Sequence, residues 1–272
     1  MTGVVVEPRS APAEGTPLPV LRAEHVGVHF GGIKALRDVT LEVRAGEVCG
    51  LIGPNGAGKT TLFDVLSGIR RPDAGSVSLD GADVSARGPV WRARHGMRRT
   101  FQRQQLFGRL TVLDNLVVAE EWRGGGGGIA ADLLGLPSRR RRERERRARA
   151  EEILELCGLA ALRDTYAGTL PVGQARLVEL ARAVVDPPKV LLLDEPASGM
   201  SPTESRWLGE VVRRLVDHEH CAVLLVEHDV AFVMGLASRV VVLDLGAVLA
   251  EGTPAEVRAN QAVRDAYLGG TA

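Results

Sequence analysis

One short loop, set between an apolar run and a helix-like segment, constrains the fold of this chain more than any other feature. Residues 53–60 read Gly-Pro-Asn-Gly-Ala-Gly-Lys-Thr and fit the pattern G-x-x-x-x-G-K-[ST] in full. The run Glu47–Ile52 before the loop is strand-like, and residues 61–66 after it carry apolar side chains at helical spacing. Glycines in such a loop let successive backbone N–H groups point at phosphate oxygens, at the positive end of the helix dipole. The sequence therefore predicts a phosphate-binding loop in an α/β fold.

The residue types in this loop indicate ATP and Mg²⁺ as ligands. Lys59 is expected to reach the β- and γ-phosphates, and the Thr60 hydroxyl is expected to bind Mg²⁺. Lysine occurs elsewhere only at positions 34 and 189, whereas arginine is used almost everywhere else. A compact ammonium is thus retained where a planar guanidinium would fit badly. The predicted nucleotide contacts in this segment are Gly53, Pro54, Asn55, Gly56, Ala57, Gly58, Lys59, Thr60 and Thr61.

Two acidic residues follow a second apolar run. The run Val190–Leu193 predicts a buried strand, and Asp194 and Glu195 come directly after it. Asp194 could hold Mg²⁺ through its water shell, and Glu195 could polarise a water molecule for attack on the γ-phosphate. The alternative is a pair of solvated acids at a strand end, which is common in general. It is disfavoured in a chain that already has the phosphate-binding loop.

A histidine and a glutamine are further candidates for the same site. His228 follows the strand-like run Ala222–Val226, where it could bind a γ-phosphate oxygen and hold Glu195 and the water in place. Gln102, in the sequence Thr-Phe-Gln, could contact both Mg²⁺ and the attacking water. A lone histidine is more often structural, and a single glutamine is a weak signal. The position of His228 after a strand supports it, because open α/β sheets bind ligands beyond the carboxyl ends of their strands.

The order of patterns along the chain indicates one domain with an insertion. Apolar runs, including Val240–Leu243, alternate with helical patterns, which favours an α/β fold with a mostly parallel sheet. From about 101 to 169 helical patterns dominate and strand signals vanish, and a helical subdomain is expected at about 101–175. Residues 1–20, rich in proline and small residues, are expected to form a disordered tail, so the domain is expected to span 21–269.

Composition argues against several classes of protein. Lys+Arg and Asp+Glu are each 34, so no excess of positive charge points to nucleic acid. No stretch approaches the roughly 18 apolar residues of a spanning helix, so other chains must supply any membrane-spanning part. Residues 139–149 carry eight Arg and two Glu, which favours a solvated helix over a contact with nucleic acid or lipid headgroups. Cys49, Cys157 and Cys221 lack metal-ligand spacing and are expected to be buried thiols.

Together these motifs resemble those of the ATP-binding cassette ATPases over about residues 21–269. In that family's terms they are the Walker A motif (53–60), the Q-loop (Gln102), the Walker B motif (Val190–Asp194), the catalytic Glu195 and the switch His228. The resemblance implies a phosphate-loop NTPase with a RecA-like core, an inserted helical subdomain and a small β-rich edge near the N-terminus. It also implies that Phe30, before Gly31-Gly32, stacks on adenine; the competing role for this residue is that of a strand core residue.

The signature motif departs from the family pattern. The usual Leu-Ser-Gly-Gly-Gln corresponds to residues 170–174, which read Leu-Pro-Val-Gly-Gln. In the family this segment closes over ATP held by the partner subunit, and its Ser hydroxyl and backbone N–H groups bind the γ-phosphate. Pro171 has neither a hydroxyl nor an N–H group, whereas Gly173 and Gln174 keep their N–H groups. The D-loop, residues 198–202, likewise has Ser where many members have Asp.

These departures resemble one branch of the family, the importer ATPases for branched-chain amino acids and related amides. The resemblance is carried by residues 170–176, 195–202 and 251–269 and by the glycine-rich insert 124–128. It implies a second cassette subunit, expected to be a different chain, and two transmembrane permease subunits. An extracytoplasmic solute-binding protein would deliver substrate, and the chain would lie at the cytoplasmic face of the cell membrane.

The sequence thus predicts an ATP-hydrolysing subunit that energises import of branched-chain or related small amino acids, with no nucleic-acid partner. One alternative is an exporter ATPase of the lipopolysaccharide type, which has a similar ending but lacks the variant signature. A second is a nucleotide-binding regulatory subunit with little hydrolysis, motivated by Pro171 and opposed by intact Glu195 and His228. A third, a cytosolic ATPase of translation or DNA repair, usually carries two cassettes or long coiled-coil insertions.

Overall fold

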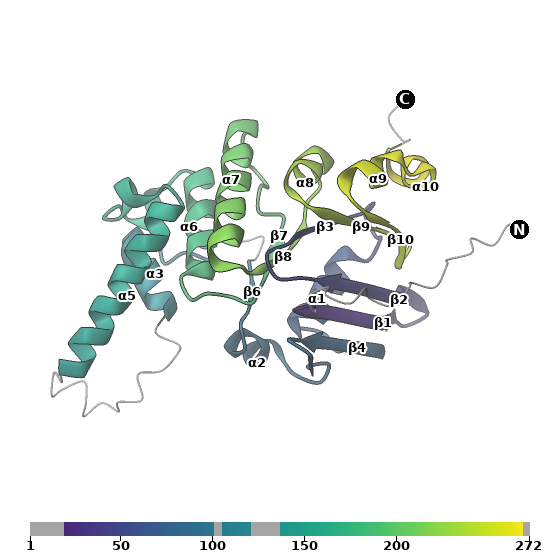
Figure 1. Ribbon diagram of the computed structural model, residues 1–272, viewed down its shortest axis with the longest axis horizontal. Coiled ribbons are helices and arrows are strands. Elements are labelled where there is room, and N and C mark those ends of the chain that lie inside the picture. The colour runs from purple at the N-terminus through teal and green to yellow at the C-terminus, as the bar shows by residue number, and fades with distance from the viewer. Residues whose placement is uncertain (1–18, 101–104, 121–136, 269–272) are drawn as a thin grey trace, which may run out of the picture.

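The computed structural model describes residues 19–100, 105–120 and 137–268 (Figure 1). Its centre is a six-stranded sheet in which the strands lie in the order β10-β9-β3-β8-β7-β6. All neighbours in this sheet are parallel except β10, which pairs antiparallel with β9. The strands span β3 Val48–Ile52, β6 Met97–Arg99, β7 Val190–Asp194, β8 Ala222–Val226, β9 Arg239–Asp244 and β10 Ala247–Gly252.

A second sheet forms the β-rich edge that the family resemblance implied. Its four strands lie in the order β2-β1-β4-β5 and are antiparallel throughout. They span β1 Leu21–Phe30, β2 Ile33–Val43, β4 Ala74–Leu79 and β5 Ala82–Asp83. Figure 1 shows β1, β2 and β4 as a layer beside α1, on the opposite side of it from β3 and β9.

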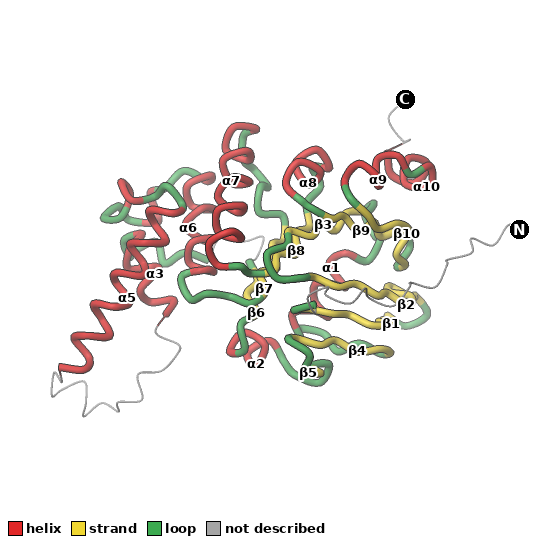
Figure 2. Tube along the Cα trace, viewed as in Figure 1, coloured by secondary structure: helices red, strands yellow, loops and turns green. Residues whose placement is uncertain are grey.

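Helices make up most of the remaining described chain. They are α1 Lys59–Ser67, α2 Pro89–Arg94, α3 Val112–Glu120, α5 Pro137–Leu156, α6 Val172–Val184, α7 Pro202–Glu219, α8 Val230–Leu236, α9 Pro254–Ala259 and α10 Gln261–Val263, with short turns η2 Ala160–Leu162, η3 Ala167–Thr169 and η4 Arg264–Leu268. Figure 2 shows α3, α5, α6 and α7 gathered to one side of the strands.

The six-stranded sheet separates two hydrophobic cores. Ile52 and Leu193 belong to a cluster that includes apolar residues of α3, α5, α6, α7 and α8. Their neighbours Leu51 and Leu192 belong to a second cluster, which includes α1 and the strands of the antiparallel sheet. Because side chains alternate across a strand, successive residues project into different cores. Helix α1 is thereby enclosed between the two sheets.

The predicted strands agree closely with the observed ones, and the predicted α/β fold is confirmed. The run 222–226 coincides with β8, and 47–52, 190–193 and 240–243 differ from β3, β7 and β9 by one residue at one or both ends. Most of the described residues from 112 to 184 form helices and short helical turns, but the limits of a subdomain stay a prediction.

Two expectations from the sequence concern residues that lie mostly outside the described ranges. The glycine-rich insert and nearly all of the expected N-terminal tail lie outside the described residues. Within the described ranges, no helix combines the length and the apolar character that crossing a membrane requires.

The parallel register aligns the carboxyl ends of three neighbouring strands. Leu51 of β3 lies opposite Val226 of β8, and Val226 lies opposite Asp194 of β7. The segments that follow these strands therefore leave the sheet side by side, at the edge where ligands of open α/β sheets bind.

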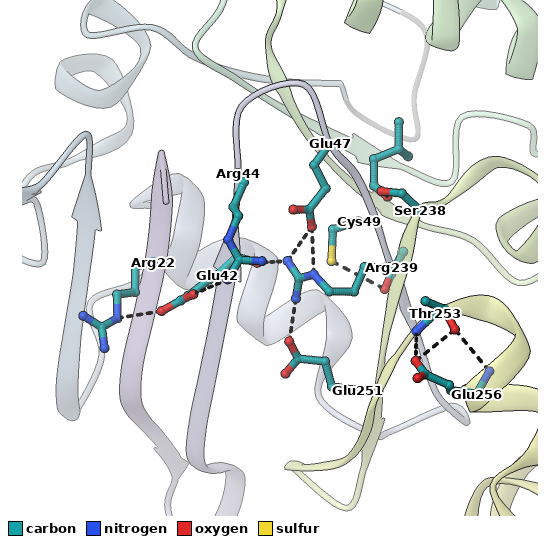
Figure 3. A network of polar contacts seen from close by, with 12 residues as sticks. Arg22, Glu42, Arg44, Glu47, Cys49, Ser238, Arg239, Glu251, Thr253 and Glu256 are labelled. Atoms are coloured by element: carbon teal, nitrogen blue, oxygen red, sulfur yellow. Dashed lines mark hydrogen bonds and ion pairs between the residues drawn. The ribbon is translucent and has the colours of Figure 1, made fainter. Parts of the chain in front are cut away.

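At the amino ends of the strands, a charged network fastens the two sheets together (Figure 3). Arg239 of β9 binds the carboxylates of Glu47 (2.5 Å) and Glu251 (2.7 Å), and it donates to the backbone carbonyl of Glu42. Glu42 lies on β2, so the guanidinium spans both sheets. Hydrogen bonds between ionised groups are stronger than neutral ones, which suits this half-buried position. The network holds the sheets together at the end away from loop 53–60.

The three cysteines are buried free thiols, as predicted. Burial raises the pKa of Cys49 and of Cys157 to about 12 and that of Cys221 to about 11. Because the thiolate is the reactive form, these side chains act as packing residues near neutral pH.

The carboxyl end of α1 is held by a fully buried arginine, which sequence reasoning missed. Arg92 of α2 donates to the carbonyl oxygens of Val65 (2.8 Å), Leu66 (2.5 Å) and Val84 (2.7 Å). Burial lowers the pKa of Arg92 to about 10, and the charge of Asp83 opposes this shift. The last carbonyls of a helix have no intrahelical partner and carry partial negative charge. The guanidinium therefore caps α1 and complements its dipole.

Replacing Arg92 by leucine should destabilise the chain strongly. Buried carbonyl oxygens would lose their donor, which we expect to lower the free energy of unfolding by about 3 kcal/mol. Urea unfolding followed by circular dichroism measures the change. The control is Arg71→Leu, because Arg71 is exposed and its hydrogen bond to the Ala86 carbonyl is 3.3 Å long. Equal losses in the two variants would contradict the capping role of Arg92.

Candidate nucleotide-binding site

The loop 53–60 joins β3 to α1, and close packing fixes two of its glycines. Gly53 has a φ of 155°, and a Cβ atom there would lie 2.2 Å from the carbonyl oxygen of Leu243. Gly58 has a φ of 104°, and its Cβ would lie 2.7 Å from the carbonyl oxygen of Ala35. Both positions require a conformation and a clearance that only glycine offers. The backbones of β9 and β2 thus support the loop from behind.

Among the described residues, no side chain caps the amino end of α1. Gly58 occupies the N-cap position without a side-chain acceptor, and the first turn holds no acidic residue. By contrast, the side chains of Ser201, Asp229 and Thr253 cap α7, α8 and α9. The first N–H groups of α1 and the positive end of its dipole are therefore available to an anion. This arrangement suits the phosphate binding that the sequence predicts.

Lys59 begins α1 and folds back over the loop. Its side chain is largely buried, and Nζ donates to the carbonyl oxygens of Gly53 (2.6 Å) and Pro54 (3.0 Å). Burial lowers the pKa of Lys59, and the charge of Glu195 opposes this shift. Among the described residues, no carboxylate accepts a hydrogen bond from the ammonium. Its charge is thus positioned by two backbone carbonyls and remains available for a phosphate.

Asp194 ends β7 and is held by an arginine that the sequence analysis did not single out. The Asp194 side chain is 8% exposed, and its Oδ2 accepts a hydrogen bond from Nη2 of Arg99 at 2.8 Å. Nη1 of Arg99 donates to Asp64 (2.7 Å) and Ser67 (3.0 Å) on α1. Arg99 was missed because its contact depends on the pairing of β6 with β7. Periodicity does not reveal which strands pair.

The oxygen donors at this edge fit Mg²⁺, a hard cation that prefers carboxylate, hydroxyl, water and phosphate oxygens. Among the described residues, Arg99 occupies only Oδ2 of Asp194. The Thr60 residue is exposed in the first turn of α1. Gln102, the third predicted Mg²⁺ contact, lies outside the described residues.

Glu195 and His228 meet at the same edge of the sheet. Nε2 of His228 lies 2.9 Å from Oε1 of Glu195. Glu195 has a φ of 49°, a left-handed conformation that costs a non-glycine residue about 1 kcal/mol or more. Its backbone N–H donates to the carbonyl oxygen of Val226 at 2.9 Å, which ties the turn to β8. The structure therefore brings together the two residues to which the sequence assigned water activation.

A second acid beside His228 was overlooked. Glu227 is buried, and it accepts hydrogen bonds from the backbone N–H groups of Ala197 (2.7 Å) and His228 (3.1 Å). Burial raises the pKa of Glu227, and these two hydrogen bonds oppose the shift. The carboxylate joins the loop after Glu195 to the loop that carries His228. The signal for Glu227 was present: an acid directly after a buried strand, as for Asp194.

Phe30 ends β1 and is 51% exposed, so it is not a strand core residue. The guanidinium carbon of Arg70 lies 4.0 Å from the centroid of its ring. Arg70 is anchored by a hydrogen bond to the His29 carbonyl (2.8 Å) and lies 3.6 Å from Asp73. An exposed ring in contact with a cation suits stacking on a flat base.

The signature residues lie at the start of α6: Gly173 and Gln174 are in its first turn, and Leu170 and Pro171 precede it. The N-cap of α6 is Pro171, no side chain caps the helix, and its first turn holds no acid. Gly173 packs so tightly on α7 that a Cβ would lie 2.2 Å from Oε1 of Glu204. Within the described ranges, neither Gly173 nor Gln174 makes a hydrogen bond to loop 53–60. The structure thus does not bring these two predicted contacts into the chain's own phosphate site.

Comparisons with known proteins agree with this site. The family model for ABC transporters matches residues 36–198, and that for the branched-chain amino acid ATP-binding cassette transporter matches residues 247–272. The high-affinity branched-chain amino acid transport ATP-binding protein LivG of Salmonella typhimurium is 41% identical over 92% of this chain and 98% of its own. The lipopolysaccharide export system ATP-binding protein LptB of Haemophilus influenzae is 33% identical over 93% and 98%. A crystal structure of the ADP conformation of an ABC-transporter cassette has a TM-score of 0.78 at 31% identity, covering 93% of this chain and 99% of its own.

The fold and the site define a phosphate-loop NTPase with a parallel α/β core. Within that class, the chain belongs to the ATP-binding cassette family of ABC transporters. It is an ATP-binding subunit of the kind that hydrolyses ATP to drive transport, together with membrane permeases.

Two glycine variants test the geometry of the loop. Gly53→Ala places a Cβ against a backbone oxygen, so we expect nucleotide affinity to fall at least ~100-fold, or about 3 kcal/mol. Gly81→Ala is the matched control, because Gly81 lies outside the loop and has a φ of 77° with open space around its Cβ position. Its conformational strain of about 1 kcal/mol predicts a loss of nucleotide affinity below ~10-fold. Titration with a fluorescent ATP analogue measures both, and equal losses would refute the packing argument.

Proposed function

We propose that this chain energises the import of branched-chain or related small amino acids. It would act at the cytoplasmic face of the cell membrane, with a second cassette subunit and two permease subunits, and indirectly with an extracytoplasmic solute-binding protein. The observation that carries the ATPase assignment is the contact between His228 and Glu195 beside loop 53–60. The substrate class is supported by the similarity to LivG and by the family match over residues 247–272.

Hydrolysis would rely on positioning and on charge stabilisation. The uncapped end of α1 and Lys59 would bind the phosphates. Thr60 and Asp194, with Gln102, would hold Mg²⁺, which supplies further positive charge at the phosphate oxygens when bound. Glu195 would accept a proton from the attacking water. The water oxygen then bonds to the γ-phosphorus as the bond to the bridging oxygen breaks, which gives ADP and phosphate.

The remaining predicted residues would act around this centre. His228 would keep the Glu195 carboxylate in place, and Phe30 would stack on adenine. Gly173 and Gln174 would offer their N–H groups to ATP held by the partner cassette, from a helical subdomain that we place at about 101–175. Pro171 removes one hydroxyl from that face, so the two ATP sites of the dimer are expected to be unequal.

Glu195→Gln should trap ATP in the assembled transporter and abolish its turnover. An amide cannot accept the proton of the attacking water, and loss of a general base costs roughly 100-fold or more in rate. The matched control is Glu210→Gln, an exposed acid on α7. Retained nucleotide and phosphate release are the measurements. Unchanged ATPase activity in the Glu195 variant would contradict the assignment of Glu195 as the general base.

The substrate class is tested with the native membrane partners. After pull-down and reconstitution in vesicles, a binding protein loaded with a branched-chain amino acid should stimulate ATP hydrolysis several-fold. Lipopolysaccharide should leave the rate unchanged. Stimulation by lipopolysaccharide alone would instead support an exporter ATPase of the lipopolysaccharide type. Little hydrolysis under either condition would favour a regulatory subunit.

A further inference from the structure

Arg99 stands where three elements of the site converge. It is the last residue of β6, and its guanidinium binds Asp194 at the end of β7 at 2.8 Å. Its other terminal nitrogen binds Asp64 (2.7 Å) and Ser67 (3.0 Å) in the second half of α1. The same group lies 5.6 Å from the centroid of the Phe63 ring. The Arg99 side chain is only 9% exposed, so solvent competes little for these contacts.

The two carboxylates around Arg99 differ in their surroundings. Asp64 is 33% exposed and can be solvated, whereas Asp194 is 8% exposed and depends on the protein for a partner. A guanidinium is a rigid planar fork, so its two terminal nitrogens keep a fixed separation. The Asp194 carboxylate is therefore tied to α1, the helix that starts with Lys59 and Thr60.

We propose that Arg99 is a positioning residue that holds the Asp194 carboxylate in register with α1, so that Asp194 and Thr60 can bind one Mg²⁺ ion. The inference rests on the proposed function, in which these two residues hold the metal. Engagement of Oδ2 restricts rotation of the carboxylate and leaves Oδ1 facing a constant direction. Groups that orient a metal ligand typically change metal affinity 10–100-fold when they are removed.

Charge compensation alone would have the opposite effect. If Arg99 only balanced the negative charge of Asp194, its removal would strengthen cation binding, because a nearby positive charge would be gone. A positioning role predicts weaker cation binding. The sign of the change therefore separates the two roles, and it can be measured without catalysis.

The test titrates Mn²⁺ into the full chain in the presence of a non-hydrolysable ATP analogue, with free Mn²⁺ followed by electron paramagnetic resonance. We expect R99Q to weaken Mn²⁺ binding roughly 10-fold or more. R99K should also weaken it, because one ammonium cannot span Asp194 and α1 as the fork does. The matched control is R98Q, because Arg98 pairs with Asp186, away from Asp194. Binding of the analogue without metal should change less than about twofold in all variants.

Unchanged or tighter Mn²⁺ binding in R99Q would overturn the inference. D194N is measured in parallel to separate this failure from that of the proposed function. If D194N leaves Mn²⁺ binding unchanged, Asp194 does not bind the metal and the proposed function is contradicted. If D194N weakens Mn²⁺ binding but R99Q leaves it unchanged, only the positioning role of Arg99 is contradicted. Should R99Q not fold, the double variant D64A/S67A removes both acceptors of Arg99 on α1 while Asp194 keeps its partner. Weaker Mn²⁺ binding in D64A/S67A supports the inference, and unaltered binding contradicts it.

Discussion

Parallel pairing of β3 with β8 and of β8 with β7 brings three strand ends to one edge of the sheet. The register places Leu51, Val226 and Asp194 in line, so the segments that follow leave the sheet together. Backbone hydrogen bonds hold this register, and both faces of the sheet are buried. A slip of one residue would turn every side chain of a strand to the opposite core, which makes the alignment costly to change. The contact between Glu195 and His228 depends on this alignment.

Helix α1 links that edge to the second sheet. It is enclosed between the two sheets, and its two ends differ in how they are capped. Its amino end is left without a side-chain cap, whereas Arg92 occupies its carboxyl end. The guanidinium partly neutralises the negative end of the dipole, and the positive end remains exposed to whatever binds the loop. Arg99 then ties the second half of the helix to Asp194.

Local patterns predicted much of this arrangement, and their limits follow from physics. A glycine spacing, an apolar run or an acid after a strand is visible along the chain, so Glu195 and His228 could be proposed before any contact was known. Arg99 and Arg92 act across elements that are adjacent only in the folded chain, and nothing in their neighbouring residues reveals the partner. Glu227 is different, because it directly follows a strand that the sequence did predict. The sequence offered no reason to choose Glu227 as well as its neighbour His228.

The bare amino ends of α1 and α6 have a thermodynamic consequence. A serine or aspartate cap stabilises a helix by about 1 kcal/mol, and both helices forgo that contribution. The isolated chain is correspondingly less stable than its fold permits, and an anion that satisfies these N–H groups restores the difference. Conformational stability and phosphate affinity are thus coupled through the same few donors. Because a Cβ at Gly58 would meet the carbonyl oxygen of Ala35, no capping side chain at that position can take the place of the anion at α1.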